Sequence, residues 1–221
     1  MKLYLDPPMS GQDNMAKDIE MLKRAREQRE ALIRIYSWDR PTISLGYFQK
    51  PEKILKLEVL EKYGINWVKR PTGGRAVWHH KEITYAVALP VDYPSLPEGV
   101  TSAYRFISEP IYKAFIKSGL PVKWARQEQN LTEACFGAPA RHEIIYNGHK
   151  VVGSAQRRTS EAILQHGSIL LAAQPEIFAA CLQGINEELL VKQLRYRTIT
   201  IPIPSTKLKK YLIAEFRRYF V

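Results

Sequence analysis

A cysteine and a lysine near the middle of the chain are the residues whose types and spacing best suit covalent chemistry. Cys135 lies in a loop that contains glycine and proline, fifteen residues before Lys150. Residues 143–146 read as a strand, Asn147-Gly148 as a two-residue hairpin turn, and 149–152 as the returning strand. A thiolate is a strong nucleophile, and a nearby ammonium group stabilises it. If the fold brings the two side chains together, the pair predicts an enzyme that forms a thioester with its substrate.

Lys150 has two interpretations in this hairpin. The register places Ile145 opposite Lys150 and Glu143 diagonal to it on the same face. On this partly apolar face, Lys150 is either a snorkelling side chain paired with Glu143 or a constrained cation beside a thiol or a substrate carbonyl.

The second candidate segment is an Arg-Pro-Thr-Gly-Gly-Arg loop at 70–75. Paired glycines let a ligand approach the backbone closely and present N–H groups to a carbonyl or phosphate oxygen. The loop is neither a Walker loop nor a GxGxxG motif, and a plain hairpin turn with two solvated arginines is the alternative. His79 and His80 follow as acid–base candidates or as structural histidines. The predicted substrate-binding residues in this region are Arg70, Thr72, Gly73, Gly74, Arg75 and His79.

A third set of small and polar residues follows Lys150, at 153–156 and 165–168. The small side chains at 153–155 leave room for an acyl chain. The predicted substrate-binding residues in this set are Gly153, Ser154, Ala155, Gln156, His166 and Gly167.

Helical and strand-like patterns alternate along the chain, without a repeat or a low-complexity linker. Helices are predicted at 9–30, 51–63, 101–118 (with Pro110 kinking or dividing it), 175–183 and 205–221, and strands at 31–36, 41–47, 66–69, 83–89 and 162–171. This order predicts an α/β (α+β) fold in which a mixed β-sheet is flanked by helices. We expect a single catalytic domain over 1–221, with a core at about 30–185 and a short strand and basic helix in 186–221.

The composition narrows the class of protein. A charged fraction of 25% and a hydrophobic fraction of 45% are ordinary for a soluble globular protein. No apolar run approaches the roughly 20 residues of a membrane helix, and the N-terminal residues lack the apolar core of a signal peptide. We therefore expect a cytoplasmic protein, a monomer, with no membrane contact.

The two cysteines and the net charge bear on redox chemistry and partners. Cys135 and Cys181 form neither a disulfide framework nor a metal-ligand spacing, and Cys181 lies in an apolar helix-like stretch that indicates core packing. The net charge of +11 favours an acidic protein or a nucleic acid as a partner, or else reflects a solvated basic surface. No metal or cofactor is predicted.

Six segments together resemble the lipoate/biotin protein ligase superfamily and, within it, the LipM-type octanoyltransferases. They are residues 41–50, 70–77, 82–85, 134–136, 148–156 and 164–171, and they occur in the family order. The resemblance implies a mixed sheet flanked by helices. It aligns Cys135 with the thioester-forming cysteine, Lys150 with the lysine that activates it, and the loop at 70–75 with part of the acyl pocket. The region after these segments is shorter than in LipM-type enzymes.

The resemblance also implies a reaction and its partners. Such enzymes move an octanoyl group from octanoyl-acyl carrier protein to a lysine of a lipoyl-accepting protein in lipoate biosynthesis. For the LipM type the acceptor is the H protein of the glycine cleavage system. The transfer exchanges a thioester for a thioester and then forms an amide, so it requires no ATP.

Two other functions remain open from the sequence. In an ATP-dependent lipoate-protein ligase, Lys150 would contact an acyl-adenylate and Cys135 would be incidental. Such ligases usually have three glycines in the loop, whereas Arg75 holds the third position here, which favours transfer. A non-catalytic basic binding protein would bind nucleic acid in a salt-dependent way. No helix-turn-helix or aromatic-studded sheet motif supports it, so we expect no nucleic-acid partner.

Overall fold

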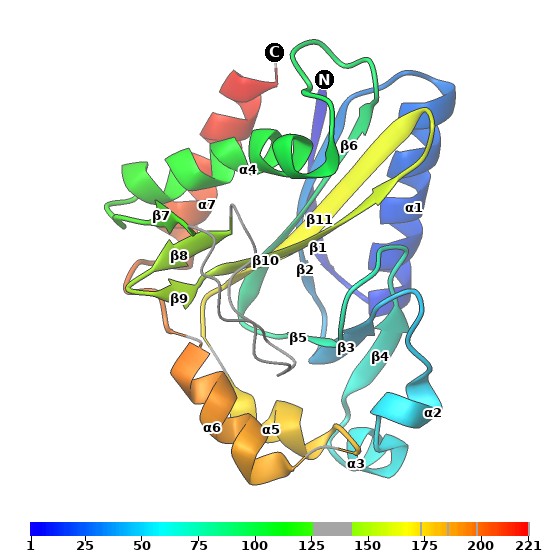
Figure 1. The fold of residues 1–221 in the computed structure, drawn as a ribbon, viewed down its shortest axis with the longest axis vertical. Coiled ribbons are helices and arrows are strands. Elements are labelled where there is room, and N and C mark those ends of the chain that lie inside the picture. The colour runs from blue at the N-terminus through cyan, green and yellow to red at the C-terminus, as the bar shows by residue number, and fades with distance from the viewer. Residues whose placement is uncertain (126–142, 173, 185, 198, 221) are drawn as a thin grey trace.

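The centre of the molecule is a five-stranded mixed sheet with strand order β1-β2-β6-β11-β10 (Figure 1). The computed structural model describes residues 1–125, 143–172, 174–184, 186–197 and 199–220. Strand β1 runs parallel to β2, and the other neighbours are antiparallel. The strands are β1 (Lys2–Met9), β2 (Leu32–Trp38), β6 (Glu82–Pro90), β10 (Val152–Arg158) and β11 (Ala162–Leu170). The predicted fold class, a mixed sheet flanked by helices, is confirmed.

Helices cover both faces of this sheet (Figure 1). Helix α1 (Gly11–Glu27) packs on one face, and α4 (Val100–Lys117) and α7 (Ser205–Tyr219) pack on the other. Strand β6 shows why both layers form. Its larger side chains, including Tyr85 and Val87, join the core with α4 and α7, while Ala86 and Ala88 meet α1. Because successive side chains of a strand point to opposite faces, β6 is buried on both sides.

Two smaller sheets complete the described fold. One has the order β4-β3-β5 and lies over a second hydrophobic core, and the other has the order β7-β8-β9. Their strands are β3 (Thr42–Leu45), β4 (Asn66–Lys69), β5 (Val77–His79), β7 (Lys123–Trp124), β8 (Ile144–Tyr146) and β9 (His149–Lys150). The second core is covered by α2 (Pro51–Ile54), α3 (Leu57–Lys62), α5 (Pro175–Ala180) and α6 (Glu187–Arg197).

The single helix predicted at 51–63 is wrong, because the chain breaks at Leu55. This residue is extended, is buried in the second core, and bridges to Leu182. The neighbouring Lys56 N–H donates to the Cys181 carbonyl at 2.9 Å. Packing against a distant segment therefore overrides the local helical pattern, giving α2 and α3 and ending α5 at Ala180.

Strand β1 was not predicted, and it contains Pro7 and Pro8, a residue type that disfavours strands. The sheet accommodates them at its edge, where a missing N–H costs no ladder hydrogen bond, and the register shifts between Leu5 and Pro8. In α4, Pro110 lies inside one continuous helix and does not divide it.

The short strand predicted within 186–221 is also wrong over the described part of that stretch, which contains α6 and α7. Helix α6 buries Leu190 and Leu194, whose spacing of four residues is that of a helix face. Helix α7 is the predicted basic helix. Over the described ranges, no helix is both long enough and apolar enough to cross a membrane.

Candidate functional site

The Asn-Gly hairpin has its predicted register. Ile145 pairs with Lys150, and the turn residues Asn147 and Gly148 have φ angles of 48° and 80°. The Lys150 ammonium forms an ion pair with the Glu143 carboxylate, and 40% of the Lys150 side chain and 10% of the Glu143 side chain remain exposed. This is the Glu143 pairing that the snorkelling interpretation predicts, and part of the Lys150 side chain still reaches solvent.

The predicted nucleophile Cys135 lies outside the residues that the structure describes. Its pairing with Lys150 stays a prediction. The other cysteine, Cys181, is buried, and burial raises the pKa of its thiol to about 11. It is a neutral thiol at physiological pH, as expected of a cysteine in the core.

The loop at 70–75 is built around an inward-facing arginine. The Arg70 guanidinium donates to the carbonyls of Ser44 at 2.9 Å, Gly73 at 2.9 Å and Arg75 at 2.7 Å. Burial lowers the pKa of Arg70 to about 10, so it is charged at neutral pH. Arg70 therefore shapes the loop from inside, whereas Arg75 is exposed, and its predicted role in substrate binding stays a prediction.

The loop also rests directly on the turn that follows β3. A Cβ atom added at Gly46 would lie 1.9 Å from the Gly74 carbonyl oxygen, so a residue with a side chain does not fit there. The Tyr47 N–H donates to the Thr72 carbonyl at 2.9 Å. These contacts join the two segments into one unit.

A chain of buried polar side chains connects Thr72 through His166 to Asp18 in helix α1. Thr72 Oγ1 lies 2.7 Å from His166 Nε2, and His166 Nδ1 lies 2.7 Å from Asp18 Oδ2. Asp18 also accepts from Arg34 at 3.1 Å and from the Tyr36 hydroxyl at 3.0 Å. Burial and the Asp18 charge raise the pKa of Tyr36 well above its usual value, so Tyr36 is a donor here.

Of these residues, Thr72 and His166 were predicted as site residues, while Asp18 and Arg34 were missed. One signal was present: Arg34 interrupts the apolar strand Leu-Ile-Arg-Ile-Tyr, and a charge in such a position requires a buried partner. The sequence does not say which partner it has.

His79 belongs to a second buried cluster. Its Nδ1 lies 2.8 Å from Glu82 Oε1, its Nε2 lies 2.7 Å from Ser44 Oγ, and its ring stacks on Trp38 with centroids 4.0 Å apart. Ser168 Oγ donates to the same Glu82 oxygen at 2.9 Å. Because both ring nitrogens of His79 have partners within the protein, this geometry favours the structural interpretation of His79.

The residues at 153–156 lie on the edge strand β10. Ser154 Oγ and the Tyr85 hydroxyl are 2.7 Å apart, and Gln156 Nε2 donates to Gln165 Oε1 at 2.8 Å. Gln165 in turn donates to Ser108 of α4 at 2.9 Å. Ser154 and Gln156 therefore lie on the α4 face of the sheet, whereas Ala155 pairs with His166, whose side chain meets α1.

The predicted glycines of this region differ in their surroundings. A Cβ atom at Gly167 would lie 2.5 Å from the Gly153 carbonyl oxygen and 2.6 Å from Ser154 Oγ. At Gly73 the same atom would meet nothing within 4 Å. Gly167 thus allows β10 and β11 to pack closely, while Gly73 leaves open space beside the loop.

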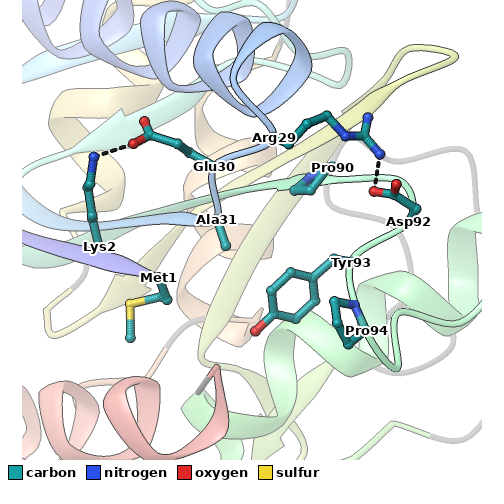
Figure 2. Close-up of a pocket in the computed structure, with 9 residues that line it drawn as sticks. All are labelled: Met1, Lys2, Arg29, Glu30, Ala31, Pro90, Asp92, Tyr93 and Pro94. Carbon is teal, nitrogen blue, oxygen red and sulfur yellow. Dashed lines mark hydrogen bonds and ion pairs between the residues drawn. The ribbon is translucent and has the colours of Figure 1, made fainter.

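A hollow of about 580 Å³ lies at the far end of the large sheet (Figure 2). Two ion pairs, Lys2 with Glu30 and Arg29 with Asp92, flank it, and none of the predicted site residues lines it. Across the described ranges, no three His, Cys, Asp or Glu side chains group as metal ligands. The candidate site is therefore the region of the 70–75 loop, strands β10 and β11, and the hairpin that carries Lys150.

A family model described as the lipoyl protein ligase A/B catalytic domain matches residues 10–220. The chain belongs to this family. Its curated relatives include octanoyltransferases of the LipM type. The chain is 42% identical to octanoyltransferase LipM of Kyrpidia tusciae over 77% of this chain and 65% of that protein. It is 38% identical to octanoyltransferase LipM of Geobacillus kaustophilus over 93% of this chain and 70% of that protein.

These matches confirm the predicted resemblance to LipM-type octanoyltransferases. The chain spans about two thirds of the length of these curated relatives, 65% of the first and 70% of the second. The fold is also similar to that of a bi-partite lipoate protein ligase from Thermoplasma acidophilum. That similarity has a TM-score of 0.79 at 21% identity and covers 99% of this chain and 82% of that one. It supports the fold of the lipoyl ligase family.

Proposed function

We propose that this chain is an octanoyltransferase of lipoate biosynthesis, acting as a single catalytic domain. It moves an octanoyl group from octanoyl-acyl carrier protein, through a thioester on Cys135, to a lysine of a lipoyl-accepting protein. The H protein of the glycine cleavage system is the proposed acceptor. The identity of 38% to a LipM octanoyltransferase over 93% of this chain carries the proposal.

In the first step the Cys135 thiolate attacks the carbonyl carbon of the octanoyl thioester on the carrier. A new carbon–sulfur bond forms to Cys135, the bond to the carrier sulfur breaks, and the carrier leaves as a thiolate that takes up a proton. One thioester replaces another, so the step is close to neutral in free energy and uses no ATP.

In the second step the neutral amine of the acceptor lysine attacks the octanoyl-Cys135 carbonyl. A carbon–nitrogen bond forms, the carbon–sulfur bond breaks, and Cys135 leaves as a thiolate while the nitrogen loses a proton. Conversion of a thioester to an amide is downhill and drives the cycle.

Lys150 is the proposed activator of Cys135. A free cysteine has a pKa of about 8.5, so only a few per cent is thiolate at neutral pH. An adjacent ammonium favours the thiolate. The ion pair with Glu143 is compatible with this role, because it orients Lys150 while leaving 40% of its side chain exposed.

The proposed acyl pocket adjoins the 70–75 loop. The hydrogen bonds of Arg70 inside this loop and of Thr72 to His166 support the proposal, because they give the loop one defined shape before substrate arrives.

The test is intact-protein mass spectrometry after mixing the protein with octanoyl-acyl carrier protein in the absence of ATP. We expect one octanoyl adduct on the wild type, no adduct on Cys135→Ala, and an unchanged adduct on the matched control Cys181→Ala. An adduct that survives Cys135→Ala, or a reaction that depends absolutely on ATP, contradicts the proposal and favours a ligase.

Lys150→Met tests the activator. At pH 7 we expect adduct formation to slow by about tenfold or more, because fewer Cys135 side chains are ionised. Raising the pH toward 9 should recover most of the rate, since an unassisted thiol with a pKa of about 8.5 then ionises by itself. A loss that does not recover at high pH would assign Lys150 a structural role instead.

A further inference from the structure

The turn after β3 exposes two aromatic side chains next to each other. Phe48 is 86% exposed and Tyr47 is 50% exposed. Their rings meet edge to face, with centroids 5.1 Å apart. Such a pair contributes little to the packing of the fold, and a solvated aromatic pair with polar surroundings is typical of a protein-binding surface.

Two cations lie beside the Tyr47 ring of this pair. Lys69 Nζ lies 5.9 Å and Arg157 Cζ lies 5.8 Å from the centroid of the Tyr47 ring. The two cations come from β4 and β10, so separate parts of the fold converge here. None of the described carboxylates forms an ion pair with either of them, or with the exposed Lys50 that follows the turn. The surface formed by Tyr47, Phe48, Lys50, Lys69 and Arg157, here called the aromatic–basic surface, thus has an apolar centre and a positive rim.

This surface is attached to the loop at 70–75. The Tyr47 N–H donates to the Thr72 carbonyl, and Gly46 packs against the Gly74 carbonyl with no room for a side chain. A molecule seated on Phe48 therefore contacts a turn that is joined to the loop carrying Thr72 and the exposed Arg75.

We propose that the aromatic–basic surface is the docking site for the acidic acyl carrier protein that donates the octanoyl group. This inference rests on the proposed function. The positive rim complements an acidic carrier, in keeping with the net charge of +11. The donor has to deliver its acyl chain to the pocket proposed beside the 70–75 loop, so a surface that docks the donor is expected to adjoin that loop.

Helix α7 supplies a second basic surface for comparison. Lys209, Lys210 and Arg217 line a shallow groove with Ile213. No hydrogen bond among the described residues links this groove to the 70–75 loop. It therefore offers a control for effects that arise from positive charge alone.

The first experiment measures acyl-enzyme formation with two donors, octanoyl-acyl carrier protein and the octanoyl thioester of a small thiol. Phe48→Ser should raise the KM for the carrier by about tenfold, as expected for a central aromatic contact. The rate with the small thioester should stay unchanged, because that donor has no protein surface. Ile19→Ser is the matched control, since Ile19 is an apolar side chain that is 51% exposed on α1 and is not part of the aromatic–basic surface.

The second experiment reverses the rim charges. Lys69→Glu with Arg157→Glu should slow association of the carrier by about tenfold and weaken its salt dependence. Lys209→Glu with Lys210→Glu changes the net charge equally and should have a much smaller effect.

Direct binding separates this proposal from the proposed function. Calorimetry with Cys135→Ala and unacylated carrier protein reports docking without chemistry. Weaker binding after Phe48→Ser in that background supports the docking site even if no acyl adduct forms on the wild type. Carrier affinity and KM that do not change in Phe48→Ser overturn the proposal. A raised KM for the acceptor alone also overturns it, because the surface would then belong to the acceptor.

Discussion

At the scale of single residues, Asp18 links the buried core to the loop at 70–75. This fully buried carboxylate accepts from Arg34, Tyr36 and His166, and through His166 it reaches Thr72 of the loop at 70–75. Arg34 is 1% exposed and has Asp6 as its other carboxylate partner. A buried guanidinium is tolerated only when such partners are in place. Asp18 therefore supports both the stability of the core and the position of the loop.

Asp18→Ala should lower the free energy of unfolding by about 3 kcal/mol. This is the lower part of the range for breaking a buried ion pair, because Arg34 keeps Asp6. Urea unfolding followed by circular dichroism measures the change. Glu20→Ala, at an exposed position of the same helix, should stay within about 0.5 kcal/mol of the wild type. Equal effects of the two substitutions would show that the Asp18 contacts contribute little.

At the scale of elements, close contacts at glycines join the strands that carry the candidate site. Gly167 lets β11 approach the backbone of β10 and the ring of Tyr85 in β6, where a Cβ atom would lie 2.9 Å from Tyr85 Cε1. Gly46 does the same for the turn after β3 and the 70–75 loop. The spacing between these elements thus depends on the absence of side chains, whatever the local preference for strand or turn.

Gly167→Ala should destabilise the protein by about 1–3 kcal/mol, because the added methyl group has to displace neighbouring backbone. Gly73→Ala is the matched control, since its Cβ atom meets no atom within 4 Å. Thermal unfolding of the two variants gives the comparison. A Gly167→Ala protein as stable as Gly73→Ala would mean that β10 can move away from β11 at little cost.

At the scale of the whole molecule, the cores on the two faces of the large sheet position the candidate site, whereas the basic net charge affects how partners approach. The core sets the positions of the loop and the hairpin, while the net charge of +11 acts on the approach of a partner. Charge complementarity changes association rates more than it changes the affinity of the docked complex. The approach of an acidic carrier should therefore depend strongly on salt.

Raising the ionic strength from about 0.02 M to about 0.5 M should reduce kcat/KM for octanoyl-acyl carrier protein by about tenfold or more, because exposed charges are screened. The same change should have little effect on the small octanoyl thioester. Stopped-flow measurement of acyl-enzyme formation gives both values. If kcat/KM depends equally on salt for the two donors, salt acts on the acyl-transfer step and not on the association of the carrier with the enzyme.

The sequence by itself was sufficient to predict the features that depend on residues close together in the chain. The Asn147-Gly148 hairpin and its Ile145–Lys150 pairing follow from turn preferences, and α1, α4 and α7 follow from helical spacing. The motif segments were also sufficient to identify the family. All of these are short-range patterns, so they can be read without knowing how the chain folds back on itself.

Only the tertiary structure decided the contacts between distant segments. Asp18 and His166 are 148 residues apart in the chain, and no local pattern predicts that they meet. Arg70 could have been a solvated charge, but the carbonyls of its own loop and of Ser44 hold it inside. The helix predicted at 51–63 breaks at Leu55 because Leu182 and the second core lie beside it. At Leu55, burial against a remote segment outweighs a local helical preference of smaller free energy. The candidate residues were therefore predictable from the sequence, while their arrangement in space was not.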